Sequence, residues 1–292
     1  MEQVLQDILK KVRALEIRSK KLSQQLFTGE YHSAFRGKGM RFKEVRDYYP
    51  GDDIRFIDWN VSARFGHPYS KVFEEERERT VMLLLDMSHS MQLGSQKRTK
   101  KELMTEIAAI LAFSALTNGD KTGAIFYTGK IEKYIPPKKG RQHLLSIVRS
   151  VLGFEPADGN TSIREACQFL QRTIPQKSIV FMLSDFIGTE ETSAFKTIGF
   201  KHDAIAVHLH DPIEDILPKA GLIPLQDAES GRIAWVDSSS TQLQKHWPLL
   251  QKRKQMFLEK QLRSSGWDYI FFSTPDDEVA LLQKFFLKRM KG

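Results

Sequence analysis

From about residue 80 onward, the chain alternates short apolar runs with longer segments whose apolar residues recur at helical spacing. A short continuous apolar run is typical of a strand buried on both faces of a sheet. Strands that alternate with helices predict a doubly wound α/β fold, in which a mostly parallel sheet carries helices on both faces. The expected strands are 81–86, 122–127, 131–135, 178–183, 203–209, 223–225, 232–236 and 268–272, and the expected helices are 97–117, 141–152, 161–173, 190–199, 240–264 and a last one capped by Thr274 and Pro275.

The first part of the chain has a different pattern. Residues 2–27 repeat apolar side chains at three- and four-residue spacing, which predicts an amphipathic helix that packs on the main domain or binds a partner. Residues 29–70 contain glycines, a Pro-Gly turn and closely spaced aromatics, which disfavour a long helix. Short strands are expected at 40–45 and 54–59, on either side of the turn at Pro50.

This change of pattern predicts two units, a helix with a small loop- and strand-rich subdomain at 1–77 and the α/β domain at 78–292.

The content of 41% hydrophobic and 27% charged residues is that of a soluble globular protein. The single cysteine, Cys167, excludes an intramolecular disulfide and a cysteine-based zinc site, and it fits a cytoplasmic setting. No transmembrane segment is expected, because the longest strongly apolar stretch, 107–116, is too short, so any membrane association is peripheral and through a partner.

Polar residues from three segments of the chain are expected at one edge of the sheet. Asp86, Ser88 and Ser90 come at the end of the first buried strand. A later buried strand ends in Asp185, and Thr161 lies in a turn just before a helix. Because the carboxyl ends of parallel strands face the same way, Asp86 and Asp185 lie near each other if their strands are neighbours. Carboxylate and hydroxyl oxygens suit a hard cation such as Mg²⁺, so these residues predict a divalent metal site without an evident catalytic base.

The same five residues carry a resemblance. Asp86-x-Ser88-x-Ser90, with Thr161 and Asp185, resembles the metal-ion-dependent adhesion site of von Willebrand factor type A domains. The resemblance implies that the two serines and the threonine are direct or near-direct ligands, and that the two aspartates bind directly or through water. It also implies Mg²⁺, or another divalent cation such as Mn²⁺ or Ca²⁺, with a position left for an acidic side chain of a partner.

A second resemblance lies upstream. Residues 46–59, followed by Ser62-Ala63-Arg64, are similar to the signature of the bacterial domain-of-unknown-function family fifty-eight. Its members are typically encoded beside MoxR-type AAA+ ATPases, which implies an adaptor that works with such an ATPase in the assembly or maturation of other proteins. The charged residues of this block either pair internally or form a docking surface. The candidate docking residues are Arg46, Asp52, Asp53, Arg55, Asp58, Trp59 and Arg64.

The expected interaction module has no catalytic residues of its own, and three other features of the sequence point elsewhere. Asp86 at a strand end is reminiscent of an aspartyl-phosphate hydrolase or phosphatase, although Ser88 stands where the general acid is expected. A nucleic-acid module would use the basic and aromatic residues of 18–46, but no recognised motif supports it. His208 and His210 alternate on one strand and could begin a transition-metal cluster, yet a third ligand is not evident.

Overall fold

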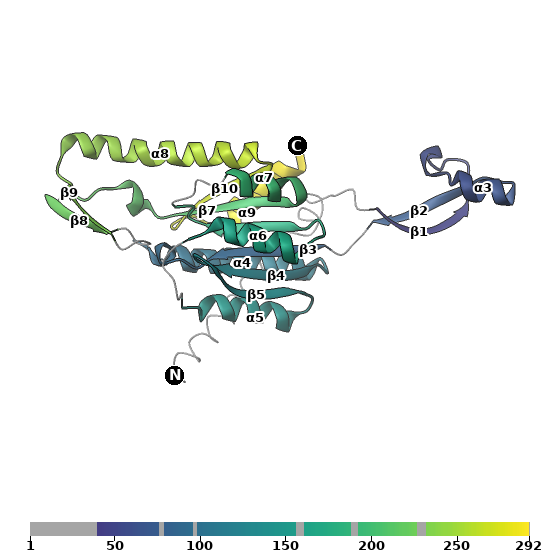
Figure 1. Cartoon of the computed structure of the whole chain (residues 1–292), viewed down its shortest axis with the longest axis horizontal. Coiled ribbons are helices and arrows are strands. Elements are labelled where there is room, and N and C mark those ends of the chain that lie inside the picture. The colour runs from purple at the N-terminus through teal and green to yellow at the C-terminus, as the bar shows by residue number, and fades with distance from the viewer. Residues whose placement is uncertain are drawn as a thin grey trace.

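A central six-stranded sheet organises the fold in the computed structural model, which describes residues 40–75, 79–95, 98–155, 161–187, 192–226 and 232–291 (Figure 1). The strand order is β10-β7-β6-β3-β4-β5, and only the edge strand β5 is antiparallel to its neighbour. The mostly parallel sheet predicted from the sequence is therefore confirmed. The strands are β3 (Thr80–Asp86), β4 (Lys121–Tyr127), β5 (Ile131–Lys138), β6 (Ile179–Ser184), β7 (Asp203–His210) and β10 (Trp267–Ser273).

Helices cover both faces of this sheet, as a doubly wound fold requires. One face packs against α4 (Lys100–Thr117), α5 (Arg141–Leu152) and α9 (Glu278–Lys291). The other packs against α6 (Ile163–Thr173), α7 (Thr192–Lys201) and α8 (Thr241–Ser264). None of the helices in the described ranges is long and apolar enough to cross a membrane.

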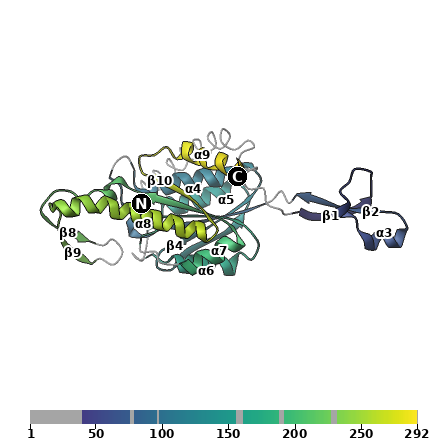
Figure 2. The ribbon, with the colours of Figure 1, turned by 90° about the horizontal axis from the view of Figure 1, so that it is seen from above.

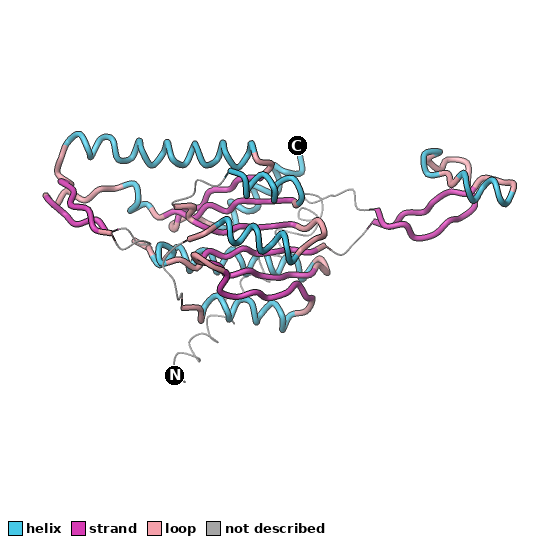
Figure 3. Tube along the Cα trace, in the orientation of Figure 1, coloured by secondary structure: helices cyan, strands magenta, loops and turns pink. Residues whose placement is uncertain are grey.

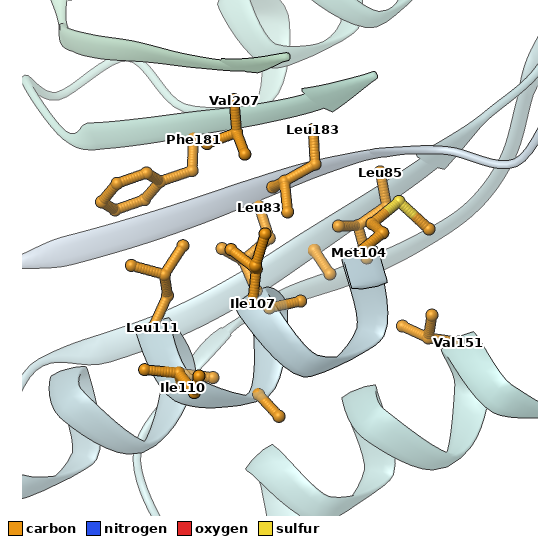
Figure 4. Close-up of a cluster of buried hydrophobic side chains, with 14 of the residues drawn as sticks. Leu83, Leu85, Met104, Ile107, Ile110, Leu111, Val151, Phe181, Leu183 and Val207 are labelled. Atoms are coloured by element: carbon orange, nitrogen blue, oxygen red, sulfur yellow. The ribbon is translucent and has the colours of Figure 1, made fainter. Parts of the chain in front are cut away.

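The apolar run of β3 is divided between the two faces because successive side chains of a strand point in opposite directions. Leu83 and Leu85 pack with Met104 and Ile107 of α4 (Figure 4). Met82 and Leu84 belong to the cluster on the other face. Every residue from 81 to 86 is fully buried, so β3 is the centre of the core and its last residue, an aspartate, is buried with it.

A two-stranded arm lies apart from the sheet, beyond the amino end of β3 (Figures 1 and 2). It pairs β1 (Met40–Asp47) with β2 (Tyr69–Glu75), and its tip carries the 3₁₀ helix η1 (Ile54–Phe56) and α3 (Trp59–Phe65). The strand predicted at 54–59 is therefore wrong. Aspartate caps outweigh the strand preference of its apolar residues, because Asp53 accepts the N–H of Arg55 and Asp58 accepts those of Asn60 and Val61.

A second two-stranded ribbon lies at the opposite end of the sheet, beyond the carboxyl ends of its strands (Figure 3). It consists of β8 (Leu222–Gln226) and β9 (Ile233–Asp237), which follow the 3₁₀ helix η3 (Pro212–Asp215). The strands predicted at 223–225 and 232–236 are thus present, but they pair with each other outside the main sheet.

The last helix begins later than predicted. Thr274 and Pro275 precede a turn, and Asp277 caps α9 by accepting the N–H groups of Val279 and Ala280 at 3.0 and 3.2 Å. The Thr274 hydroxyl is engaged elsewhere, since it donates to Asp211 at 2.6 Å. The helix predicted over 2–27 and the predicted boundary after residue 77 both lie outside the described residues.

Gly199 of α7 lies directly against the backbone of the turn before β10. A Cβ atom at this position would lie 2.0 Å from the carbonyl oxygen of Ser265. We expect Gly199→Ala to lower the free energy of unfolding by roughly 1–3 kcal/mol, although alanine normally stabilises a helix. Urea unfolding measures this, with the exposed Lys196→Ala as a same-helix control that changes stability by less than about 0.5 kcal/mol. A more stable Gly199→Ala variant would contradict the contact.

Candidate functional site

The candidate site begins where two neighbouring central strands end. β3 and β6 are paired in parallel, with Leu85 opposite Leu183. Asp86 therefore stands beside Ser184, and Asp185 follows at once. Asp86 is fully buried and Asp185 is 4% exposed. Because their strands are neighbours, the two carboxylates lie near each other at one buried edge of the sheet, as expected for adjacent strands.

Both oxygens of Asp86 accept hydrogen bonds. Oδ1 accepts the backbone N–H of Ser88 at 3.0 Å, and Oδ2 accepts the hydroxyl of Ser184 at 2.6 Å. These donors offset part of the cost of burying the carboxylate. Burial is nevertheless the main influence and, with the nearby charge of Asp185, it raises the pKa of Asp86 to about 7.

The turn after β6 is built around a left-handed residue. Phe186 has a φ of 54°, which is uncommon for a bulky residue. This conformation brings the N–H of Phe186 to the Ser184 hydroxyl at 2.9 Å and the N–H of Ile187 to Oδ1 of Asp185 at 3.2 Å. The strained turn therefore fixes both Ser184 and Asp185 at the site.

Ser88 and Ser90 bring two buried hydroxyls to the same edge. Their Oγ atoms lie 3.0 Å apart, and the side chains are 0% and 4% exposed. Ser88 precedes the 3₁₀ helix η2 (His89–Gln92), but its hydroxyl makes no capping bond to the helix. The Ser88 hydroxyl is thus not used as a helix cap, and its oxygen lies beside that of Ser90.

Thr161 arrives from a third segment. The N–H of Ser162 donates to the carbonyl of Thr128 at 2.8 Å, just after β4. The carbonyl of Tyr127, the last residue of β4, accepts the N–H of Met87, also at 2.8 Å. Thr161 is thereby tied to the edge that carries Asp86, and Ser162 is the residue that caps α6. Asp158, Gly159 and Asn160, which precede it, lie outside the described residues.

Lys100 is a site residue that sequence reasoning missed. Its Nζ atom donates to Oδ2 of Asp185 at 2.7 Å and to Oε1 of Glu214 at 2.5 Å, and the side chain is fully buried. Burial alone would lower the pKa of Lys100, but the two carboxylates raise it overall, so the ammonium is charged. The available sequence signal was the capping box of Thr99 and Glu102, which starts α4 at this edge.

The donor set consists of oxygen atoms, which fit a hard divalent cation by type. In the described part of the chain, no group of three or more His, Cys, Asp or Glu side chains is arranged to hold a metal. A metal at this edge therefore needs hydroxyl ligands beside the two carboxylates, and the hydroxyls of Ser88 and Ser90 are buried there.

The two histidines of β7 are engaged with other side chains. His208 is buried, its Nδ1 lies 2.7 Å from the Tyr269 hydroxyl, and burial lowers its pKa to about 4. His210 contacts Glu214 through Nδ1 at 2.7 Å and Asp215 through Nε2 at 2.9 Å. They therefore serve as structural partners of this edge.

The candidate docking residues gather at the tip of the arm, at the opposite end from the carboxylates. Internal pairing accounts for many of them: Arg46 pairs with Asp52 at 2.9 Å and Arg55 with Asp53 at 2.7 Å. Asp58 caps α3. Arg64 is exposed and forms no ion pair within the described ranges. Around this network, the tip exposes large apolar side chains, namely Tyr49, Ile54, Trp59 and Phe65.

The chain is similar to several known proteins. The family model described as "Protein of unknown function DUF58" matches residues 44–256. An uncharacterized protein of Mycobacterium bovis is 28% identical over 284 residues, which cover 96% of this chain and 89% of that protein. The solved structure of an aerotolerance-related membrane protein from Bacteroides fragilis has a TM-score of 0.50 at 17% identity, covering 73% of this chain and 98% of that one, a likeness of fold alone. The SpRpn10 VWA domain has a TM-score of 0.43 at 12% identity, covering 70% and 93% of the two chains.

The raised pKa of Asp86 makes the stability of the folded chain depend on pH. The folded chain keeps a proton on Asp86 between about pH 4 and 7, where the unfolded chain has lost it, so its contribution to stability falls as the pH rises. We compare the free energy of unfolding of Asp86→Asn with that of the wild type, both in EDTA. As the pH rises from 4.5 to 7.5, we expect this difference to shift in favour of the variant by about 1 kcal/mol or more, because the amide does not titrate.

Urea unfolding of both proteins at the two pH values measures this difference. His208 titrates in the wild type and in the variant, so its contribution cancels. A difference that stays constant with pH would mean that Asp86 has an ordinary pKa in the folded chain.

Proposed function

The chain belongs to the family of unknown function DUF58, and from this premise we propose that it is a non-catalytic, Mg²⁺-dependent interaction module. The observation that carries the proposal is the pair of buried hydroxyls, Ser88 and Ser90, whose oxygens lie 3.0 Å apart beside two buried carboxylates. Buried hydroxyls and carboxylates that converge at the carboxyl edge of a parallel sheet form a ligand site of the kind expected for this fold class.

In this proposal, the hydroxyls of Ser88, Ser90 and Thr161 are ligands, and Asp86 and Asp185 bind directly or through water. A bound ion would supply an electrophile for a carboxylate of the partner protein. The chain's own residues hold the ligands in place: Ser184 and the Ser88 N–H fix Asp86, and the left-handed turn at Phe186 fixes Asp185.

We assign a second role to the tip of the arm, as the docking surface for a MoxR-type AAA+ ATPase. Its support is the signature block at residues 46–64, together with the exposed side chains of Trp59 (71%) and Phe65 (63%). Trp is enriched among the residues that contribute most of the binding energy of protein interfaces. The arm and the metal site lie at opposite ends of the sheet, so both can be engaged at once, as an adaptor requires.

Several features favour an interaction module over the hydrolase alternative. An aspartyl nucleophile must be ionised and exposed, whereas Asp86 is fully buried, accepts two hydrogen bonds and has a raised pKa. The imidazoles of His208 and His210 are engaged with neighbouring side chains. The proposed setting is the cytoplasm, where the free thiol of Cys167 stays reduced.

Metal binding is tested by calorimetric titration of the purified chain with MgCl₂. We expect the Ser88→Ala/Ser90→Ala double variant to lose at least about tenfold in Mg²⁺ affinity, because two hydroxyl ligands are removed. The exposed Ser146→Ala serves as the control, and circular dichroism verifies the fold. A second measurement compares the amount of acidic client protein that the immobilised chain binds in Mg²⁺ with the amount that it binds in EDTA. Equal Mg²⁺ affinity in all three proteins, or capture that EDTA leaves unchanged, would refute the metal site.

The docking role of the arm is tested with Trp59→Ala. We expect affinity for a MoxR-type ATPase to fall about tenfold or more, as for an interface anchor. Trp235→Ala is a matched control, since Trp235 is 66% exposed but lies on the ribbon at the other end of the molecule. Mg²⁺ binding should be unchanged in both variants. Equal loss of ATPase binding in both variants would exclude a specific role for the arm.

A further inference from the structure

Lys100 places a fixed positive charge inside the candidate metal site. It lies in the first turn of α4, and its ammonium is fully buried between Asp185 at 2.7 Å and Glu214 at 2.5 Å. A buried ammonium is tolerated only when it is paired and hydrogen-bonded. The two carboxylates meet that need, and they come from different strand ends, β6 and β7.

In this arrangement, both oxygens of Asp185 are occupied by donors of the chain itself. Oδ1 accepts the N–H of Ile187 at 3.2 Å, and Oδ2 accepts the ammonium of Lys100. A divalent ion that uses Asp185, directly or through water, competes with this ammonium for the same carboxylate. It also repels the ammonium, because like charges at short distance in a buried site interact strongly.

Glu214 provides a place for the ammonium to remain. Its Oε2 contacts Nδ1 of His210 at 2.7 Å, and its backbone carbonyl accepts the indole N–H of Trp247 at 2.9 Å. Asp211 and Glu214 also form a capping box that holds η3. Glu214 is therefore a fixed second partner, which keeps Lys100 paired if Asp185 is taken by another cation.

We propose that Lys100 is an internal counter-ion that competes with the metal. Its ammonium neutralises Asp185 in the metal-free chain, and it pairs with Glu214 alone when Mg²⁺ binds at Asp185. The competition with Mg²⁺ rests on the proposed metal site. The neutralisation of Asp185 in the absence of metal, which we call the metal-free role, does not. Two consequences follow. The site stays folded without metal, and Mg²⁺ binds more weakly and exchanges more readily than it would at two unpaired carboxylates.

Lys100→Met separates this role from ordinary structural support, because its two expected effects have opposite signs. In EDTA, the thermal midpoint should fall, since Asp185 and Glu214 lose their buried cation. Mg²⁺ affinity, measured by calorimetry with MgCl₂, should rise about tenfold or more, because the competitor is gone. Saturating Mg²⁺ should therefore raise the midpoint more in Lys100→Met than in the wild type.

Three further variants sharpen the test. Lys101→Met is the matched control: this neighbouring lysine donates to the Phe154 carbonyl, so its loss should leave Mg²⁺ affinity unchanged. Lys100→Arg keeps the charge and should keep the weaker affinity of the wild type. Glu214→Gln removes the second partner of the ammonium and should weaken Mg²⁺ binding below that of the wild type. The last two keep a polar or charged side chain, so they serve if Lys100→Met does not fold.

Each outcome supports or overturns the inference. Equal Mg²⁺ affinity in Lys100→Met and the wild type overturns the competition while leaving the proposed metal site intact. If neither protein binds Mg²⁺, the proposed function fails and the competition fails with it. The metal-free role is then decided in EDTA alone, where adding Asp185→Asn to Lys100→Met should restore part of the lost thermal midpoint. An unchanged midpoint in EDTA for Lys100→Met overturns that role.

Discussion

Two carboxylates buried at the end of an apolar sheet are the feature on which the rest of this edge depends. A buried ionised carboxylate is costly unless it is paired and hydrogen-bonded. The chain offsets part of this cost at Asp86 with the Ser88 N–H and the Ser184 hydroxyl, and it pairs Asp185 with Lys100. The left-handed turn at Phe186 and the start of α4 both serve the same requirement, because each positions one of these donors.

The requirement also links elements that are distant along the chain. Lys100 connects the end of β6 to η3 through Glu214, and Trp247 connects η3 to α8. Asp211 adds a second connection, since it accepts hydrogen bonds from Ser95 and from the Thr274 hydroxyl. The carboxyl edge is therefore a network of charged and polar groups, whereas the interior of the sheet is held by apolar packing.

The features that the sequence predicted well are the buried strands, whose continuous apolar runs are a clear signal. The runs 81–86 and 178–183 predicted two strands buried on both faces of a parallel sheet, and the structure shows that these strands are neighbours, which brings Asp86 and Asp185 to the same edge. The arm was predicted poorly, because single aspartate caps decide between strand and helix in a short segment. Lys100 was missed because a lysine at a helix start usually faces water, and its inward direction depends on carboxylates more than 80 residues away along the chain.

The edge strand β5 carries consecutive prolines near its end, Pro136 and Pro137, where its register with β4 shifts around Gly123. Proline has no N–H to donate, so a strand from another molecule cannot continue the hydrogen-bond ladder past these residues. Sheet extension past these two residues is therefore disfavoured on this side of the sheet. A partner that binds here has to be recognised through side chains, and the identity of those side chains can make the recognition selective.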